Sequence, residues 1–375
     1  MNFLITLFSF FISFVATATG TTNFDYNKEG YLTQAKYADG STTNRYPDAK
    51  GNLYEDANLK DREYTHGGKL VKKGSWHYKY NHQGFLTTKY KKVGRIFVIK
   101  EDEWNYEWNS AGLLEKVYRP DGAVVSFGYD ALGRRIWKNY RQTTTHRHWD
   151  GNVPLHSLSR FFFGKWKGFV SKDALSENLI TWIFEEDSFS PIAKLRGEKK
   201  YSILADHLGT PYESYDDKGD LIWSRELNSN GKVIKETGIQ NFCPFLYQGQ
   251  SLDNEIELAY NRFRYYDVED GRYISQDPIG LAGNNPNFYS YTKNSNYLVD
   301  LFRLDPLGTG APLKNGFLFY KNELSLWTIY HKNVDTIMAH VHLGILAYWL
   351  VNTIRYQLKQ QKSHHNFMVK IMMMK

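Results

Sequence analysis

Cysteine is nearly absent from the sequence, because Cys243 is the only one among 375 residues. A single cysteine excludes an internal disulfide framework and a metal site built from several thiolates. We therefore expect Cys243 to be a free thiol that packs like a small apolar residue. Net positive charge is also small outside the C-terminal end, because basic and acidic residues nearly balance there. Residues 313–375 carry eight Lys and Arg against two acidic residues, so they hold most of the net charge of +7.

Aromatic residues are abundant, with 28 Tyr, 23 Phe and 10 Trp, and the chain also has 29 Gly. This composition favours many short strands over long helices. In a recurring unit, two aromatic residues two positions apart are followed by Asn or Asp, two further residues, Gly, and soon an apolar residue. Because residues two apart share one face of a strand, and Asn, Asp and Gly form tight turns, each copy predicts one β-hairpin. The copies lie at 24–32, 78–86, 106–114 and 127–136, with weaker ones at 213–221 and 226–233.

Two histidines, His156 and His207, lie in stretches bounded by Gly and Pro that follow the stronger repeats. No second His, Cys or acidic residue stands at metal-ligand spacing from either one, so we expect both to be structural. The sequence thus predicts no metal, no cofactor and no small-molecule substrate.

The most distinctive local pattern runs from residue 258 to residue 283. Aromatic and apolar residues alternate there with Asn261, Arg262 and Arg264, which predicts one half-buried strand over 258–266. The segment DVEDG at 267–271 has the residues of a hairpin turn, and a second strand is predicted over 272–276. Pro278 ends that strand because proline has no N–H to donate. We therefore expect Asp277 to be held at the end of a rigid strand.

This stretch resembles the RHS repeat-associated core, the signature region near the C-terminal end of RHS/YD-repeat proteins, and the hairpins resemble YD repeats. The matching segments are YQGQ at 247–250, NRFRYYD at 261–267, GRYISQDPIGLAG at 271–283 and NFYSY at 287–291. The family winds its repeats into a spiralling antiparallel sheet that forms a hollow shell. The resemblance implies a mainly β fold, and the small number of repeats predicts a partial shell. Its partners would be the rest of an RHS shell or a secretion apparatus.

The resemblance implies a structural function first: a truncated shell fragment of a polymorphic-toxin or effector-delivery protein whose C-terminal effector has been replaced. A second interpretation is enzymatic, because members of this family typically cut themselves behind the core with an aspartic-protease-like pair. Asp277 matches the first carboxylate, and we favour Asp300 as the second, with cleavage after Leu304. Asp305 is an alternative second carboxylate, and Asp267 is a third candidate, better explained as a turn cap. Two adjacent carboxylates share a proton, so one can activate water while the other polarises the carbonyl.

The C-terminal segment resembles the last part of insertion-sequence DDE transposases, in TIYHKN at 328–333 and MAHVHLGILAYWLVNTIRYQLK at 338–359. The catalytic acids of that family lie upstream of this part, so no transposase activity is implied. A helix is predicted from Ile337 to about Lys359, capped by Asp335. Its apolar part, from Ile337 to Ile354, has the composition of a core or membrane-contacting helix. Nucleic-acid binding by the basic tail is the third functional alternative, and we rank it last.

The N-terminal residues begin with the apolar run FLITLFSFFISFV, followed by Ala16-Thr17-Ala18. This pattern predicts an export signal cleaved after Ala18, and the alternative is an irregular start of a truncated reading frame. A genuine signal would make the protein secreted or part of the cell envelope, and otherwise it would be cytoplasmic. We expect four parts: a signal-like segment at 1–22, YD repeats at 23–240, the core at 241–309 and the transposase-like remnant at 310–375.

Overall fold

The computed structural model describes residues 14–17, 20–28, 30–94, 99–161, 178–186, 188–278, 280, 286–292, 294–296, 318–321 and 327–330. The chain forms two compact units, Met1–Gly310 and Ala311–Lys375. Regular structure in the described residues is antiparallel β-sheet apart from the 3-10 turn His66–Gly68. The predicted helix beyond Ile337 lies outside them. No helix among the described residues is long and apolar enough to cross a membrane.

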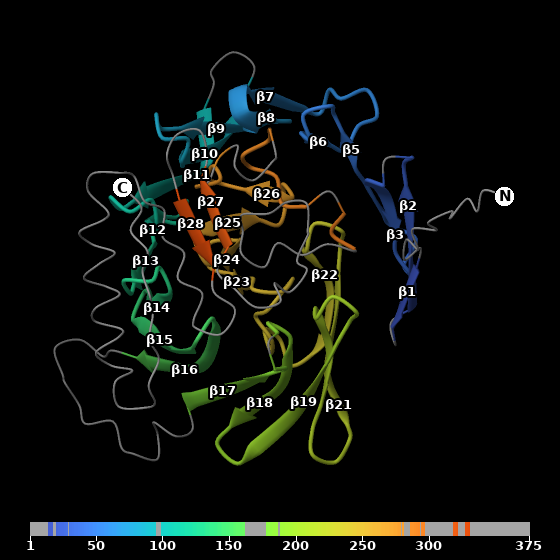
Figure 1. Cartoon of the computed structure of the whole chain (residues 1–375), viewed down its shortest axis with the longest axis vertical. Helices are drawn as coiled ribbons and strands as arrows, with labels where there is room; N and C mark the ends of the chain where they lie inside the picture. Colours follow the sequence, from blue (N-terminus) through green and yellow to red (C-terminus); the bar gives the residue numbers. More distant parts are fainter. Residues whose placement is uncertain are drawn as a thin grey trace. The chain divides into compact units, whose positions relative to one another are not determined.

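The first unit is built around a 16-stranded sheet, called the wall below, in which every strand pairs antiparallel with its neighbours in the chain (Figure 1). The edges of the wall are β7 and β22, so its hydrogen bonding does not close into a barrel and the predicted partial shell is confirmed. The strands are β7 (Arg62–Thr65), β8 (Lys69–Lys73), β9 (Trp76–Tyr80), β10 (Leu86–Val93), β11 (Ile99–Trp108), β12 (Leu114–Tyr118), β13 (Val124–Tyr129), β14 (Arg135–Tyr140), β15 (Thr143–Asp150), β16 (Val153–Phe161), β17 (Leu179–Phe184), β18 (Pro191–Arg196), β19 (Lys199–Ala205), β20 (Pro211–Tyr215), β21 (Leu221–Leu227) and β22 (Val233–Gly238).

The predicted hairpins of the recurring unit are confirmed, and their turns share one hydrogen-bond pattern. In the copy at 78–86, Asn81 Oδ1 accepts a hydrogen bond of 2.9 Å from the N–H of Phe85, and the N–H of Gly84 donates to the Asn81 carbonyl at 3.1 Å. The Asn or Asp that begins the turn of each other copy accepts in the same way from the residue four positions on. The side-chain oxygen therefore accepts the backbone hydrogen bond that a carbonyl of the paired strand would otherwise accept, at the point where the two strands separate.

Smaller sheets complete the described structure. The first unit has a four-stranded sheet before the wall, a short two-stranded sheet, and another four-stranded sheet after the wall, and the second unit has one hairpin. These strands are β1 (Phe14–Thr17), β2 (Gly20–Tyr26), β3 (Leu32–Lys36) and β4 (Thr42–Asn44); β5 (Tyr46–Pro47) and β6 (Leu53–Tyr54); β23 (Ser251–Asp253), β24 (Leu258–Asn261), β25 (Arg264–Asp267) and β26 (Arg272–Tyr273); and β27 (Leu318–Lys321) and β28 (Trp327–Tyr330). Residues 14–17, within the predicted export signal, form β1, whereas Ala18 lies outside the described residues.

The prediction of one strand over 258–266 was wrong, because the chain turns back within it. Arg262 adopts a left-handed φ of 57° and forms a two-residue turn with Phe263, so that Asn261 pairs with Arg264. Nothing in those residue types signals a turn. The second strand, predicted to reach Gln276, ends at Tyr273. β24 and β25 were also expected to be half-buried, but every residue in both is buried because each face of this small sheet is covered.

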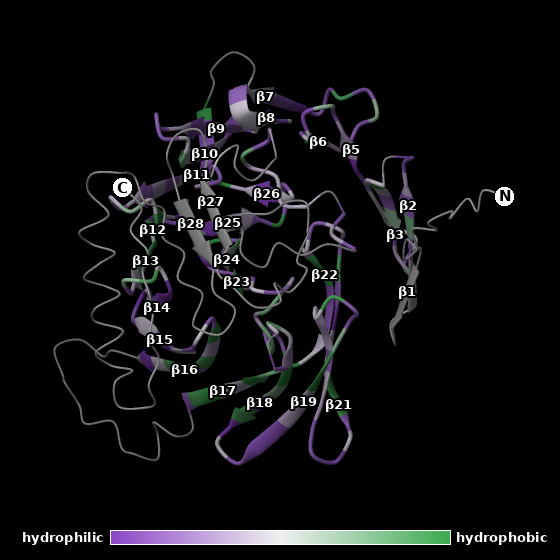
Figure 2. Cartoon of the chain, in the orientation of Figure 1, coloured by the Kyte–Doolittle hydropathy of each residue, from purple (hydrophilic) through white to green (hydrophobic). Residues whose placement is uncertain are grey.

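The last part of the first unit, residues 241–296, is called the inner segment below. Its strands β23–β26 lie inside the curve of the wall (Figure 1). One hydrophobic cluster joins wall residues such as Tyr78, Tyr106 and Phe127 to Leu258 and Tyr265 of the inner segment. Along the wall, apolar residues alternate with hydrophilic ones, and the hairpin ends of β18–β19 and β21 are hydrophilic (Figure 2). Burying each large side chain contributes about 1.5–3 kcal/mol, so the cluster fixes the inner segment on the wall.

Candidate functional site

Asp277, the predicted site residue, lies at a corner of the inner segment. Its residue exposure is 9%, and its Oδ2 lies 3.5 Å from Nη2 of Arg264. The Arg264 guanidinium in turn lies 3.6 Å from the ring centroid of Tyr273. The Asp277 backbone is fixed by its N–H, which donates to the Phe288 carbonyl at 2.8 Å. A buried carboxylate at a constrained corner is therefore present, although it follows β26 by several residues.

The remaining members of the predicted cleavage machinery, Asp300, Asp305 and Leu304, lie outside the described residues. The pairing of Asp277 with Asp300 therefore stays a prediction.

Asp267, the third candidate, has the geometry of the expected turn cap. Its Oδ1 accepts hydrogen bonds from the N–H of Glu269 at 2.9 Å and of Asp270 at 3.0 Å. Its Oδ2 accepts from Nζ of Lys89 on β10 at 2.9 Å. One carboxylate thus closes the turn locally and attaches it to the wall.

Asp267 and Asp270 form a buried acidic pair, each residue being 2% exposed. Burial and the neighbouring Asp270 charge raise the pKa of Asp267. Burial alone would also raise the pKa of Asp270, but the cations of Lys89, Lys73 and Arg62 outweigh it and hold this pKa well below its ordinary value. The pair therefore favours one ionised carboxylate and one that is more easily protonated. The role of Asp270 was not predicted, since its basic partners lie about 200 residues away in the chain.

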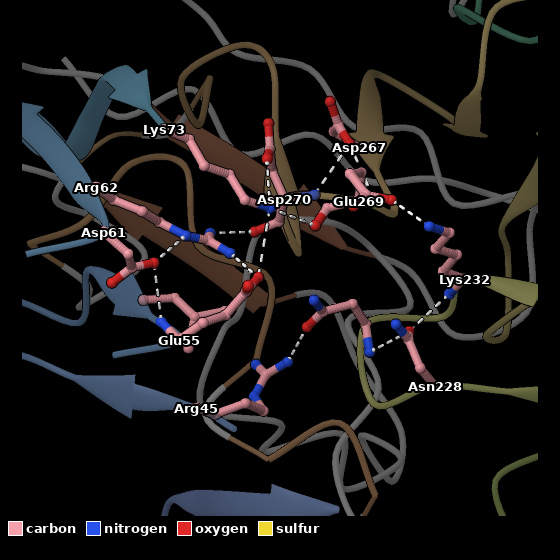
Figure 3. Close-up of polar contacts among 12 residues, drawn as sticks. Arg45, Glu55, Asp61, Arg62, Lys73, Asn228, Lys232, Asp267, Glu269 and Asp270 are labelled. Carbon is pink, nitrogen blue, oxygen red and sulfur yellow. Dashed lines mark hydrogen bonds and ion pairs between the residues drawn. The ribbon is translucent and has the colours of Figure 1, made fainter. Parts of the chain in front are cut away.

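The turn at 267–271 contacts strands near both edges of the wall. Lys73 of β8 places Nζ 3.3 Å from Oδ1 of Asp270, and Lys232, just before β22, places Nζ 2.6 Å from Oε2 of Glu269. Figure 3 shows Lys73 and Lys232 on opposite sides of the turn. Arg62 of β7 adds a hydrogen bond of 2.7 Å to the Asp270 carbonyl. Arg62 and Lys73 at one end of the wall and Lys232 at the other are therefore attached to one short turn.

A second buried ion pair joins the middle of the wall to the inner segment. The Arg135 guanidinium of β14 forms a two-point contact with the Asp253 carboxylate of β23, with Nη2 and Oδ1 3.0 Å apart. Lys138 adds a contact of 2.8 Å to Asp253 Oδ1. Burial would raise the pKa of Asp253, but Arg135 and Lys138 outweigh it and keep the pKa well below its ordinary value. Asp253 is therefore a buried anion that needs its cationic partners.

The two histidines and the cysteine have structural surroundings. His156 Nδ1 lies 2.9 Å from Thr181 Oγ1, and His207 Nε2 lies 2.8 Å from the Asn296 carbonyl oxygen. Cys243 is a buried free thiol, as predicted, and its burial raises its pKa. Among the described residues, no group of three or more His, Cys, Asp or Glu side chains could hold a metal ion.

A cavity of about 590 Å³ lies between the wall and the inner segment. Aromatic residues of β9 and β11, including Trp76 and Trp104, line one part, and Asp267, Glu269 and Asp270 line another. The turn that holds the wall therefore borders this cavity as well as packed core.

This chain is similar in sequence to known proteins. A Teneurin YD-shell sequence model matches residues 5–297. Double-stranded DNA deaminase toxin A of Burkholderia cenocepacia (strain H111) is 28% identical over 345 residues, covering 84% of this chain and 23% of the relative. Toxin protein Tse5 of Pseudomonas aeruginosa is 44% identical over 118 residues, covering 31% of this chain and 8% of the relative.

The chain thus spans less than a quarter of the length of these curated relatives. Among solved structures, the TcdB2-TccC3-TEV structure aligns with a TM-score of 0.47 at 16% identity, over 76% of this chain and 17% of that one. Since the family match spans most of the wall and the inner segment, the chain belongs to the Teneurin YD-shell family of RHS/YD-repeat proteins.

Proposed function

We propose that this chain is a structural shell fragment of a toxin-delivery type protein, in which the inner segment holds the curved wall in place. The observation that supports this is the attachment of both wall ends to the turn at 267–271, through Lys73 and Lys232. One relative named as a toxin is 28% identical to this chain over 84% of its length. Residues 311–375 would stand where such proteins carry an effector, which here has been replaced. The expected partner is further shell sequence or a delivery apparatus.

Limited proteolysis of the full chain with a C-terminal epitope tag tests the proposal. If the inner segment holds the wall, the wild-type protein gives one resistant body that contains both. D253N leaves the buried Arg135 without its anion, so it should separate wall from inner segment and expose sites in both. D121N, which removes a carboxylate from a solvent-exposed turn, is the matched control. Equal digestion of wild type and D253N would contradict a holding role for the inner segment.

We propose self-cleavage after Leu304 by Asp277 and Asp300 as the second candidate function. The favouring observation is the burial of Asp277 beside Arg264, since a nearby cation favours the ionised form of a carboxylate. Asp277 would then be the base that activates water, and Asp300 the acid that polarises the scissile carbonyl. The reaction would occur once in each molecule.

Intact mass measurement of the purified chain tests cleavage directly. Fragments ending and beginning at the Leu304–Asp305 bond are expected in the wild type and absent in D277N and D300N. D305N serves as the control, because cleavage that depends on Asp305 would assign the second carboxylate to that residue. An uncleaved wild-type chain would rule out this second function and leave the structural one untouched.

Nucleic-acid binding by residues 313–375 remains a prediction from charge alone. It requires salt-sensitive DNA affinity that disappears when these residues are deleted.

A further inference from the structure

A second cavity, of about 170 Å³, lies where the wall faces residues 241–244 of the inner segment. Its wall side is formed by neighbouring strands, because Arg147 pairs with Ser157 and Thr145 pairs with Ser159 between β15 and β16. Trp182 of β17 and Lys194 of β18 are also paired and continue the lining. The cavity does not belong to the candidate site built around Asp277 and the turn at 267–271.

The charges around this cavity are unbalanced. Its lining has four cationic side chains and no Asp or Glu. Arg135 and Lys138 are neutralised by Asp253 and Glu255. Arg147 and Lys194 form no ion pair with any carboxylate in the described part of the chain. The Lys194 ammonium lies 3.8 Å from the ring centroid of Phe242 and 5.1 Å from that of Trp182, and the charge of Asp253 also acts on Arg147. Because buried charges are normally paired and neither cation contacts a carboxylate, this cavity favours the binding of an anion.

The hydrogen-bond donors of these two cations are also incompletely used. Arg147 Nη2 donates to Ser251 Oγ at 2.8 Å, but its Nη1 is buried and has no acceptor among the described residues. The Lys194 side chain is 7% exposed and donates to the Phe242 carbonyl at 2.6 Å, which leaves further N–H donors on the ammonium. The hydroxyl groups of Thr145 and Ser159 hydrogen-bond to each other at 2.9 Å, so one of these two, together with the Ser157 hydroxyl, can donate to a ligand.

The lowered pKa values of Arg147 and Lys194 agree with a site that favours an anion. Burial, followed by the nearby Arg135 charge, lowers the pKa of Arg147 to about 10. Burial lowers the pKa of Lys194 to about 8. Both groups therefore carry their charge at a cost that a bound anion would remove.

We propose that this cavity binds a small oxyanion, held by Arg147, Lys194 and the hydroxyl groups of β15 and β16. The volume holds an ion of that size, since one water occupies about 30 Å³ of liquid. The ligand would connect the wall to residues 241–244 and so stabilise the attachment of the inner segment. The same chemistry could be supplied by a free inorganic anion or by a peptide carboxylate, and the test separates these sources.

The test is thermal unfolding of the full chain near neutral pH, titrated with sodium phosphate, sulfate or acetate against sodium chloride at constant ionic strength. Phosphate or sulfate should raise Tm in a saturable way beyond chloride. R147Q and K194M should each weaken the apparent affinity by about tenfold, the effect of losing one charge-assisted contact. R160Q should match the wild type, since Arg160 is an exposed residue of β16 whose strand partner is Thr144, outside the cavity lining.

A stronger response to acetate than to phosphate would support the site and assign its natural ligand to a carboxylate. The proposal is overturned if no oxyanion raises Tm beyond chloride, or if wild type, R147Q and K194M respond equally. If R147Q does not fold, R147K, which keeps the charge, together with K194M and calorimetric titration with phosphate, gives the same decision. None of these outcomes depends on self-cleavage or on the proposed shell function.

Discussion

Gly133, in the turn between β13 and β14, lies directly against Phe263 of the inner segment. A Cβ at this position would stand 2.7 Å from Phe263 Cε1, so the approach of the two segments requires glycine. Gly122, in the preceding turn, has a nearly equal φ of +78° against +72°, but a Cβ there would meet nothing within 4 Å. Alanine substitutions at these two glycines therefore distinguish the cost of backbone strain from the cost of a clash with the inner segment.

G133A should destabilise the protein more than G122A. Both substitutions place alanine in a left-handed conformation, which costs roughly 1–2 kcal/mol. G133A adds a steric conflict with Phe263, for which overpacking costs about 1–3 kcal/mol more. Urea unfolding followed by tryptophan fluorescence measures both. Equal losses would show that Phe263 moves aside freely and that this contact does not fix the inner segment.

The buried Arg135–Asp253 pair should show strong coupling in a double-mutant cycle. R135M or D253N alone leaves an uncompensated buried charge and should cost about 3–5 kcal/mol. The double variant should lose less than the sum of the two, because neither charge then remains. Asp121, whose side chain is exposed in a turn, provides the control, and D121N should change the free energy of unfolding very little. Additive losses at Arg135 and Asp253 would contradict direct pairing.

Asp267 and Asp270 should differ in how much stability is lost when each is replaced by asparagine. D270N should cost on the order of 3 kcal/mol near neutral pH, because it removes the anion beside Arg62, Lys73 and Lys89. D267N should cost less, because an asparagine carbonyl can still cap the turn and the pKa of Asp267 is already raised.

The loss of stability caused by D270N should depend on pH, because the pKa of Asp270 is lowered in the folded state. Since the folded-state pKa of Asp270 lies below its ordinary value of 3.8, its stabilisation is complete above that pH and is lost as the pH falls below it. The difference in unfolding free energy between wild type and D270N should therefore shrink in acid. A constant difference across this range would mean that the lost contribution is packing and not charge.

Lys194 should make stability rise with pH on the alkaline side. Its folded-state pKa of about 8 lies below the ordinary 10.5, so the unfolded chain binds more protons between these values. The unfolding free energy of the wild type, measured against K194M, should increase over this interval in chloride buffer. K200M, at an exposed position of β19, should leave the wild-type profile unchanged. A flat difference between wild type and K194M would contradict an uncompensated buried ammonium.

The sequence predicted those features that are determined by residues close together in the chain, and it did not predict those that depend on residues far apart. The repeat hairpins and the cap formed by Asp267 were predictable, because Asn or Asp and Gly fix each turn within five residues. The turn at Arg262 was not, since a left-handed arginine is stabilised by its surroundings and not by its own preference. The partnership of Arg135 with Asp253 spans 118 residues and leaves no local pattern. The same applies to the cavity at Arg147.

Arg62 is synthesised long before Asp270, the residue to which it is hydrogen-bonded in the folded chain. These two residues are 208 positions apart, and at 5–20 residues per second the ribosome needs roughly 10–40 seconds to produce the second after the first. During that interval the aromatic side of the early strands has no covering partner. Nascent chains of this protein should therefore be substrates for ribosome-associated chaperones until the last hairpins emerge.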